Sequence, residues 1–372
     1  MKNFPALSST LGDSNPEAKQ EGKDENDSEE EDPARCEWDF THAAIVSSGT
    51  EAETVVADTL GAVDFDPSGD LFVTGGISRK IRIYSLKSLL SHQNIDCGSE
   101  VAVLDHSRTC EYFMCTPAKL SSLRWKPQSG GRYDLERRTP VFERDEHGGR
   151  RVWSVDYSHW DPVVGASGSD DGTVQMWDPR CDGGSCVAQA QPSGSRSSVC
   201  CVEFNPFGGA LLAVGCADRR AYAYDVRMMS APVLVLEGHS KPVTYVRFLD
   251  HQTVVTAATD GCLKLWQAGE PRPVRTYRGH SNSRRFVGLS VWRSGGLLGC
   301  GSESNQVFVY DKRWGEPIWV HRFGPVAPPE VGSVFVSGVC WRQVGEDDCT
   351  LVAGGSDGVL HVLEGKRRRI IS

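Results

Sequence analysis

The sequence of 372 residues predicts an all-β fold in which similar sheets close into a ring, a β-propeller. Abundant glycine (39) and tryptophan (10), together with 19 prolines, favour short strands and tight turns over long helices. A pattern of three apolar strands, the last ending in an aromatic residue, also recurs along the chain. The clearest third-strand aromatics are Trp177, Tyr224, Trp266 and Tyr310, which are 47, 42 and 44 residues apart.

Short dipeptides identify the type of repeat. Gly238-His239 and Gly279-His280 each precede a copy, and Trp177-Asp178 ends one. A period of this length with Gly-His and Trp-Asp is the signature of WD repeats. The 326 residues from Trp38 to Leu363 allow seven blades of about 47 residues each. The complete copies span residues 60–86, 152–178, 199–227, 243–266, 286–311 and 336–363.

The second copy is shortened. The aromatics that end its first and third strands, Trp125 and Tyr133, are 8 residues apart, whereas Phe65 and Tyr84 of the first copy are 19 apart. Ten to twelve residues are therefore absent, which is one strand and its turn. The sequence predicts a seven-bladed WD-repeat β-propeller with an incomplete second blade, in which the strand at 120–125 lacks a neighbour on one side.

Closure of the ring is predicted from the two ends of the repeat region. No fourth strand follows the last copy after Leu363, and a lone strand at 36–46 precedes the first copy. Because closure removes exposed sheet edges, we expect the lone strand to become the outer strand of the last blade.

Charge divides the chain into three parts. Residues 1–34 hold ten acids and three lysines, a net charge of -7, which leaves -2 for the other 338 residues. This segment has too few apolar residues to form a core. We expect a disordered acidic tail at 1–34, the propeller at 35–364 and a basic end at 365–372. The basic run at 366–369 suits either nuclear import or a solvated chain end.

Composition also excludes several classes of function. The near-neutral body argues against nucleic-acid binding, and no apolar run approaches the ~18 residues of a membrane span. The start of the chain lacks the apolar core of a secretory signal, so an intracellular location with mostly reduced cysteines is expected.

No enzyme, metal or cofactor site is expected. His239, Thr256, Asp260 and Trp266 stand at the spacing of the hydrogen-bonded network inside a WD blade, and His147, Ser167, Asp171 and Trp177 repeat it. These sets therefore need no catalytic explanation. Neither a glycine-rich phosphate loop nor an HExxH metal motif occurs, and no cysteine pair has zinc spacing.

Longer motifs carry a family resemblance that covers residues 35–364. The chain resembles the plant repressors of UV-B photomorphogenesis (RUP proteins), which are similar to the WD-repeat domain of the constitutively photomorphogenic E3 ubiquitin ligase. The motifs are ARCEWDF, GISRKIRIY, CTPAKLSSLRW, VFERDEHGGRRVWSVDY, GSDDGTVQMWDPRC and RGHSNSRRFVGLSVW.

The resemblance implies a non-enzymatic interaction protein of the nucleus and cytoplasm. It would bind the UV-B photoreceptor through a Val-Pro-type tail peptide and promote the photoreceptor's return to the inactive dimer. An alternative is a substrate receptor that docks on the damaged-DNA-binding adaptor of a cullin-4 ligase. The constitutively photomorphogenic ligase itself is a further implied partner.

The resemblance also assigns residues. In the related ligase one propeller face binds Val-Pro peptides with an acidic flank. Trp153 and Phe286 would contact Val and Pro, and the cations would meet the acids, although each cation also suits a solvated rim. Arg219 stands where the ligase has histidine, and one tyrosine of the ligase site falls in the missing stretch. The matching positions are Lys119, Arg151, Trp153, Arg219, Lys241 and Phe286. Adaptor docking would use Trp177, Asp178 and Arg180 of the Trp-Asp-x-Arg stretch.

Overall fold

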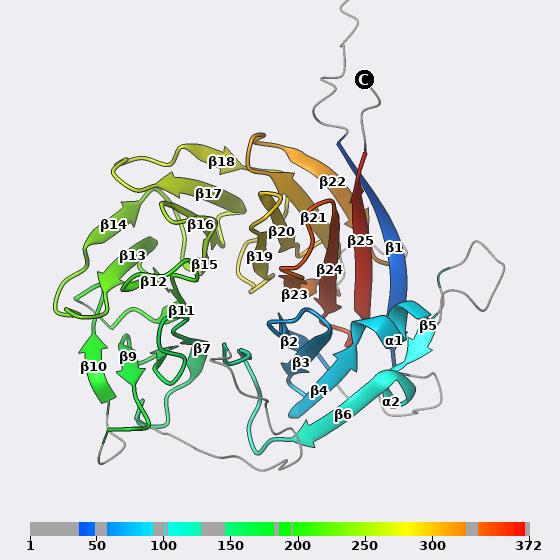
Figure 1. The fold of residues 1–372 in the computed structure, drawn as a ribbon. Helices are drawn as coiled ribbons and strands as arrows, with labels where there is room; N and C mark the ends of the chain where they lie inside the picture. Colours follow the sequence, from blue (N-terminus) through cyan, green and yellow to red (C-terminus); the bar gives the residue numbers. More distant parts are fainter. Residues whose placement is uncertain are drawn as a thin grey trace, which may run out of the picture.

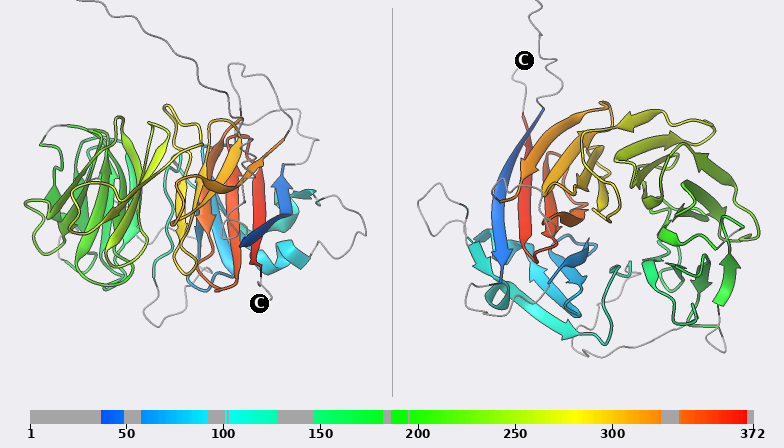
Figure 2. Two further views of the ribbon diagram at one scale, coloured as in Figure 1. Left: turned by 90° about the horizontal axis from the view of Figure 1, so that it is seen from above. Right: turned by 180° about the vertical axis from the view of Figure 1, so that it is seen from behind.

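The computed structural model describes residues 37–48, 58–91, 101, 103–127, 146–181, 186–194, 196–324 and 334–368. The predicted acidic tail lies outside the described residues. Six sheets stand in a ring around a central channel, as Figures 1 and 2 show, and the first strand of each complete repeat lies nearest the centre. The expected propeller architecture is therefore confirmed, while the number of sheets differs from the prediction.

Five sheets are four-stranded antiparallel meanders. Each is named here by its innermost strand. Their strands are β2 (Leu60–Phe65), β3 (Leu71–Gly76), β4 (Lys80–Ser85) and β6 (Cys110–Cys115); β7 (Val152–Tyr157), β8 (Gly165–Ser169), β9 (Val174–Trp177) and β10 (Cys186–Ala190); β11 (Val199–Phe204), β12 (Leu211–Cys216), β13 (Arg220–Asp225) and β14 (Leu234–Glu237); β15 (Val243–Phe248), β16 (Thr253–Ala258), β17 (Cys262–Gln267) and β18 (Arg275–Tyr277); and β19 (Leu289–Trp292), β20 (Leu297–Gly301), β21 (Gln306–Asp311) and β22 (Pro317–Arg322).

The last sheet closes the ring. It contains β23 (Val336–Trp341), β24 (Asp348–Gly355), β25 (Leu360–Arg367), β1 (Trp38–Ser47) and β5 (Val103–Asp105), in that order. β1 pairs with β25 antiparallel along its length, from Trp38 opposite Arg367 to Val46 opposite Leu360. This pairing confirms the predicted closing strand. β25 continues three residues beyond the expected boundary at 364, so part of the basic end belongs to the sheet.

A seam joins the β2 sheet to the last sheet. The connection from β4 to β6 holds α1 (Leu86–Ser91), β5 and α2 (His106–Thr109), and β5 pairs parallel with β1. Leu86 and Leu89 are buried in one apolar cluster with Val46 of β1. Apolar burial of this kind supplies most of the stability of a packed seam.

Three polar contacts cross or line the same seam. Arg82 of β4 pairs with Asp58, and the Nη2–Oδ2 distance is 2.7 Å. His106 contacts the Gly358 carbonyl of the last sheet through Nε2 at 2.9 Å and the Tyr84 hydroxyl through Nδ1 at 2.7 Å. The seam is thus held by both apolar and polar contacts.

The prediction of seven blades is wrong for the described residues, which form six sheets. In place of the second sheet, the described part of the second copy at 120–127 contains no strand, and residues 128–145 lie outside the described residues. Ser121 Oγ donates to the Val152 carbonyl at 2.5 Å, and the Asp64 carboxylate accepts from Trp125 N at 2.8 Å. Because these side-chain contacts replace a β ladder, the segment keeps a place in the ring without forming a strand.

The internal blade networks agree with the prediction. His239 contacts Thr256 Oγ1 at 2.8 Å and Asp260 Oδ2 at 3.0 Å, and Trp266 Nε1 donates to Thr256 Oγ1 at 2.8 Å. His147 contacts Ser167 Oγ at 2.8 Å and Asp171 Oδ2 at 2.7 Å in the same way. These polar groups therefore satisfy one another inside their blades.

Candidate functional site

The strand order places the predicted peptide-binding residues on one face. Residues that precede an innermost strand, or that join the second strand to the third, lie on what we call the upper face; the other turns form the lower face. Arg151, Trp153, Lys241 and Phe286 lie at or before the start of β7, β15 and β19. Arg219 lies in the turn from β12 to β13, and Lys119 precedes the segment 120–127. All six predicted residues therefore share the upper face.

Trp153 and Phe286 form an aromatic stack. Their ring centroids are 4.7 Å apart and their planes are inclined by 11°. Because β7 and β19 lie on opposite sides of the ring (Figure 1), the stack spans the mouth of the central channel. Tyr245 meets Phe286 edge to face at 5.8 Å. The sequence did not identify Tyr245, although its place on an innermost strand was a signal that it could face the channel.

Two groups hold Trp153 in this orientation. Its indole Nε1 donates to Asp170 Oδ1 at 2.5 Å, and the Arg151 guanidinium carbon lies 4.7 Å from the ring centroid. Asp170 N also donates to the Arg151 carbonyl at 3.0 Å. A charge-assisted hydrogen bond and a cation–π contact therefore act on one ring. Asp170 is a positioning residue that sequence reasoning missed.

The remaining predicted cations are dispersed. Lys241 is exposed, and its Nζ donates to the Ser283 carbonyl at 3.4 Å, in the loop that carries Phe286. Lys119 is exposed beside Leu120, which lines the channel. Arg219 is exposed in a separate depression that Glu237 also lines. The structure thus brings together Arg151, Trp153 and Phe286, with Lys241 joined through the loop.

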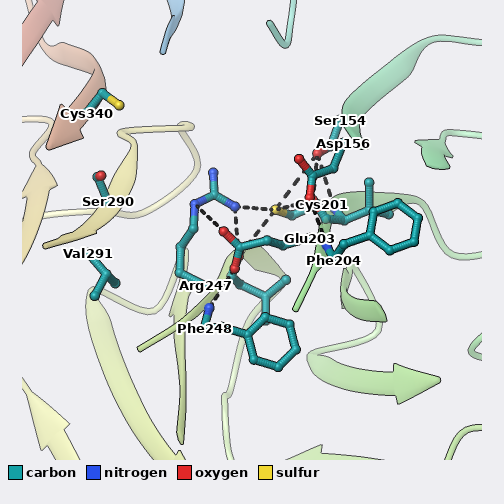
Figure 3. A network of polar contacts seen from close by, with 12 residues as sticks. Ser154, Asp156, Cys201, Glu203, Phe204, Arg247, Phe248, Ser290, Val291 and Cys340 are labelled. Atoms are coloured by element: carbon teal, nitrogen blue, oxygen red, sulfur yellow. Dashed lines mark hydrogen bonds and ion pairs between the residues drawn. The ribbon is translucent and has the colours of Figure 1, made fainter. Parts of the chain in front are cut away.

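The central channel contains charges of both signs. At the position before the last aromatic residue of each innermost segment stand, in chain order, Asp64, Arg124, Asp156, Glu203, Arg247, Val291 and Cys340. In Figure 3 the Arg247 guanidinium contacts both the Glu203 carboxylate and the Cys201 sulfur. Arg124 fills the position of the incomplete second copy, so the channel keeps seven positions. Burial raises the pKa of Asp156 to about 7, and the neighbouring Arg124 opposes this rise.

Two cavities occupy the channel. The upper cavity has a volume of about 300 Å³ and is lined by Trp153 and Phe286. The lower cavity has a volume of about 620 Å³ and is lined by Asp64, Asp156 and Glu203. Among the described residues, no group of three or more His, Cys, Asp or Glu side chains could hold a metal ion.

The predicted docking residues lie on the lower face. Arg180 follows β9, and its guanidinium pairs with Asp161 at 2.5 Å and with Asp178 at 2.6 Å. Trp177 is partly buried and meets Tyr157 edge to face at 5.3 Å. Of the three residues, Arg180 is therefore the one that is exposed, with 56% of its side chain accessible.

Comparison with known proteins shows which families the chain resembles. Residues 56–85 match the WD domain, G-beta repeat, and residues 129–310 match the nucleolar protein 10-like N-terminal domain. The chain is 35% identical over 323 residues to E3 ubiquitin-protein ligase COP1 from Arabidopsis thaliana, which is 82% of this chain and 45% of that ligase. No helix within the described ranges is long and apolar enough to cross a membrane.

Two further relatives match over most of their length. The chain is 54% identical over 348 residues to WD repeat-containing protein RUP1 from Arabidopsis thaliana, covering 90% of this chain and 86% of that protein. It is 60% identical over 329 residues to WD repeat-containing protein RUP2 from the same plant, covering 84% of this chain and 89% of that protein. The chain therefore belongs to the RUP family of WD-repeat proteins, the repressors of UV-B photomorphogenesis whose motifs its sequence carries.

Proposed function

We propose that this protein is a non-enzymatic negative regulator that binds the UV-B photoreceptor at the upper face and promotes its return to the inactive dimer. The aromatic stack of Trp153 and Phe286 is the observation that carries the proposal. It places two half-buried aromatic rings at the mouth of the channel, flanked by Arg151 and by the exposed Lys241.

A Val-Pro peptide with an acidic flank suits this surface chemically. Proline is already restricted in φ, so it loses little backbone entropy when it packs on an aromatic ring. Acidic residues before it would meet Lys119, Arg151 and Lys241, whose charges lie toward solvent. Such rim charges chiefly speed encounter and select the partner, while the buried aromatic contacts supply most of the affinity.

Promotion of the dimer requires more than capture of a tail. A protein that bound only the photoreceptor monomer would stabilise the monomer by mass action. The proposed role therefore requires preferential binding to the dimer or to the path toward it. We propose that the tail peptide acts as a tether at the upper face, and that a second contact distinguishes the two states of the photoreceptor.

The test is titration calorimetry with a peptide that contains an acidic-x-Val-Pro sequence. We expect Trp153→Ala to weaken binding by roughly 30-fold or more, because truncation of a central aromatic anchor costs about 2 kcal/mol or more. Trp160→Ala is the matched control, since Trp160 is 83% exposed on the lower face. Equal affinity for the two variants, both folded by circular dichroism, would contradict the proposal.

Docking on the cullin-4 adaptor is a second proposal, and the constitutively photomorphogenic ligase remains a further candidate partner. The exposed Arg180 supports adaptor docking because it lies on the lower face, so an adaptor there would not compete for the peptide site. The pairing of Arg180 with Asp161 and Asp178 supports a bracing role instead. A variant of Arg180 distinguishes these roles, as described below.

A further inference from the structure

The upper cavity of the channel differs from the lower cavity in its charges. Its charged lining residues are Arg124, Arg247 and Arg285, and no carboxylate of the described residues lines it. Arg124 and Arg247 also line the lower cavity, together with Asp64, Asp156 and Glu203. The arginines therefore face both cavities, whereas these carboxylates face only the lower one, and the upper cavity has an excess of positive charge.

The carboxylates do not fully compensate these arginines. Arg124 lies 3.5 Å from Asp156 through Nε and 3.7 Å from Asp64 through Nη1, and Arg247 Nε lies 3.9 Å from Glu203. All three distances are longer than the usual distance of a charge-assisted hydrogen bond. One oxygen of each carboxylate accepts a backbone amide instead: Asp156 from Phe204 N at 2.7 Å and Glu203 from Phe248 N at 2.6 Å. Glu203 also accepts from Arg293 Nη2 at 3.4 Å, so the shortest hydrogen bonds of both carboxylates are to the neighbouring strand and not to Arg124 or Arg247.

The hydrogen bonding of the Arg247 guanidinium is also incomplete, because one of its acceptors is a weak one. Its Nη1 donates to the Val246 carbonyl at 2.8 Å and to Cys201 Sγ at 3.2 Å (Figure 3). A thiol sulfur is a weak acceptor. A buried guanidinium that donates to sulfur gains when an anion replaces that partner, because hydrogen bonds between ionised groups are about twice as strong as neutral ones.

The rest of the lining restricts the class of anion. Tyr245, Leu289 and Val339 contribute apolar and aromatic surface, and Arg285 lies over the Phe335 ring at 4.2 Å. A volume of about 300 Å³ lies at the lower end of the range for small-molecule pockets. A flat apolar body with one anionic group matches this lining better than a small, strongly hydrated inorganic ion does.

We propose that the upper cavity binds a small organic carboxylate, with its anionic group at Arg247 and Arg285 and its apolar or aromatic body against Tyr245 and Leu289. Trp153 and Phe286 also line this cavity, so it adjoins the proposed Val-Pro surface. Binding of the carboxylate and binding of the peptide are measured separately, so failure of one proposal does not decide the other.

Thermal unfolding of the full chain with sodium benzoate tests the proposal, at an ionic strength held constant with sodium chloride. Benzamide is the matched probe, because it has the same ring and a neutral amide of similar shape. We expect benzoate to raise the melting temperature in a saturable way, with a dissociation constant in the millimolar range typical of so small a ligand. Benzamide should have little effect.

Two variants assign the effect to this cavity. Arg247→Met removes the charge at similar length and should abolish the benzoate shift. Arg285→Ala, at a half-buried position, should weaken binding at least fivefold and decides the question if Arg247→Met does not fold. Equal shifts with benzoate and benzamide, no saturable shift, or a benzoate shift unchanged in the folded arginine variants would each overturn the proposal.

Discussion

The buried ion pair of Asp58 and Arg82 should contribute measurably to closure of the ring. The two side chains are 9% and 11% exposed, and both guanidinium Nη atoms donate to the carboxylate, at 3.3 and 2.7 Å. A Cβ at Gly358 of the last sheet would lie 3.0 Å from the Asp58 Cβ, so the pair also packs against the opposite side of the seam. Asp58→Ala would leave the Arg82 charge buried without its carboxylate.

Loss of one partner from a buried pair costs about 3–5 kcal/mol. With an unfolding entropy of about 2.1 cal/mol/K per residue, a domain of about 300 residues loses roughly 5–8 °C in melting temperature. Replacing both partners, in Asp58→Ala with Arg82→Met, should recover most of the loss because no charge is then stranded.

Asp70→Ala provides the matched control. Asp70 is 77% exposed and lies 3.6 Å from Arg342, and pairs of this kind contribute about 0–1 kcal/mol. Differential scanning calorimetry of Asp58→Ala, Arg82→Met, the double variant and Asp70→Ala gives the comparison. The reasoning fails if Asp58→Ala melts within about 1 °C of Asp70→Ala, or if the double variant is as unstable as the sum of the single changes.

Three further predictions concern the site and the closing strand. Asp170→Ala should weaken Val-Pro peptide binding in calorimetry by about 1.5–3 kcal/mol, the value of a hydrogen bond to a charged group, whereas Asp170→Asn keeps an acceptor for Trp153 and should retain most of the affinity. Burial, with the neighbouring charge of His321, lowers the pKa of His42 to about 4, so its stabilising effect is complete above pH 6.5 and is lost as the pH falls toward 4. Denaturant unfolding should therefore show a stability that falls as the pH decreases from 6.5 toward 4, and His42→Leu should remove only part of this fall. His321 and His361, which pack against His42, account for the remainder because burial also lowers their pKa values. Arg180→Ala should reduce co-purification of the cullin-4 adaptor without changing photoreceptor capture, and loss of both partners would show that Arg180 only braces its blade.

The repeat predicted those parts of the fold that depend on local pattern. The third-strand aromatics recur in sequence, so the blades and the closing pair of β1 and β25 followed from spacing and from one unmatched strand at each end. The seam was not predictable in the same way. Residues 87–109 belong to no repeat, and β5 forms only because β1, from the other side of the closure, provides its partner.

The shortened blade shows the same limit of prediction from local sequence pattern. Its missing strand was visible as a change in spacing, but the substitute contacts were not. Ser121 bonds to Val152 and Trp125 to Asp64, across blades that the sequence separates by tens of residues. No local pattern distinguishes such serines from ordinary turn residues.

For the candidate site, the motifs supplied Trp153 and Phe286 but not Asp170, the residue that orients Trp153. Asp170 and Asp171 are adjacent in one turn, and the repeat pattern explains only Asp171, which bonds to His147. Asp170 can orient Trp153 only because the Trp153 indole lies across this turn in the folded blade. The pairing of Arg180 with Asp161 depends in the same way on two turns that meet only in the folded blade.

The pairing of β1 with β25 has a consequence for synthesis of the protein. β1 is made before every other described strand, whereas its partner Leu360–Arg367 is made some 320 residues later. At ~5–20 residues per second, β1 waits roughly 16–64 s for that partner. During this interval its edge groups are open to other strands, so the nascent chain depends on chaperones or on transient local pairing. A premature stop within the last repeat would make that unpaired state permanent.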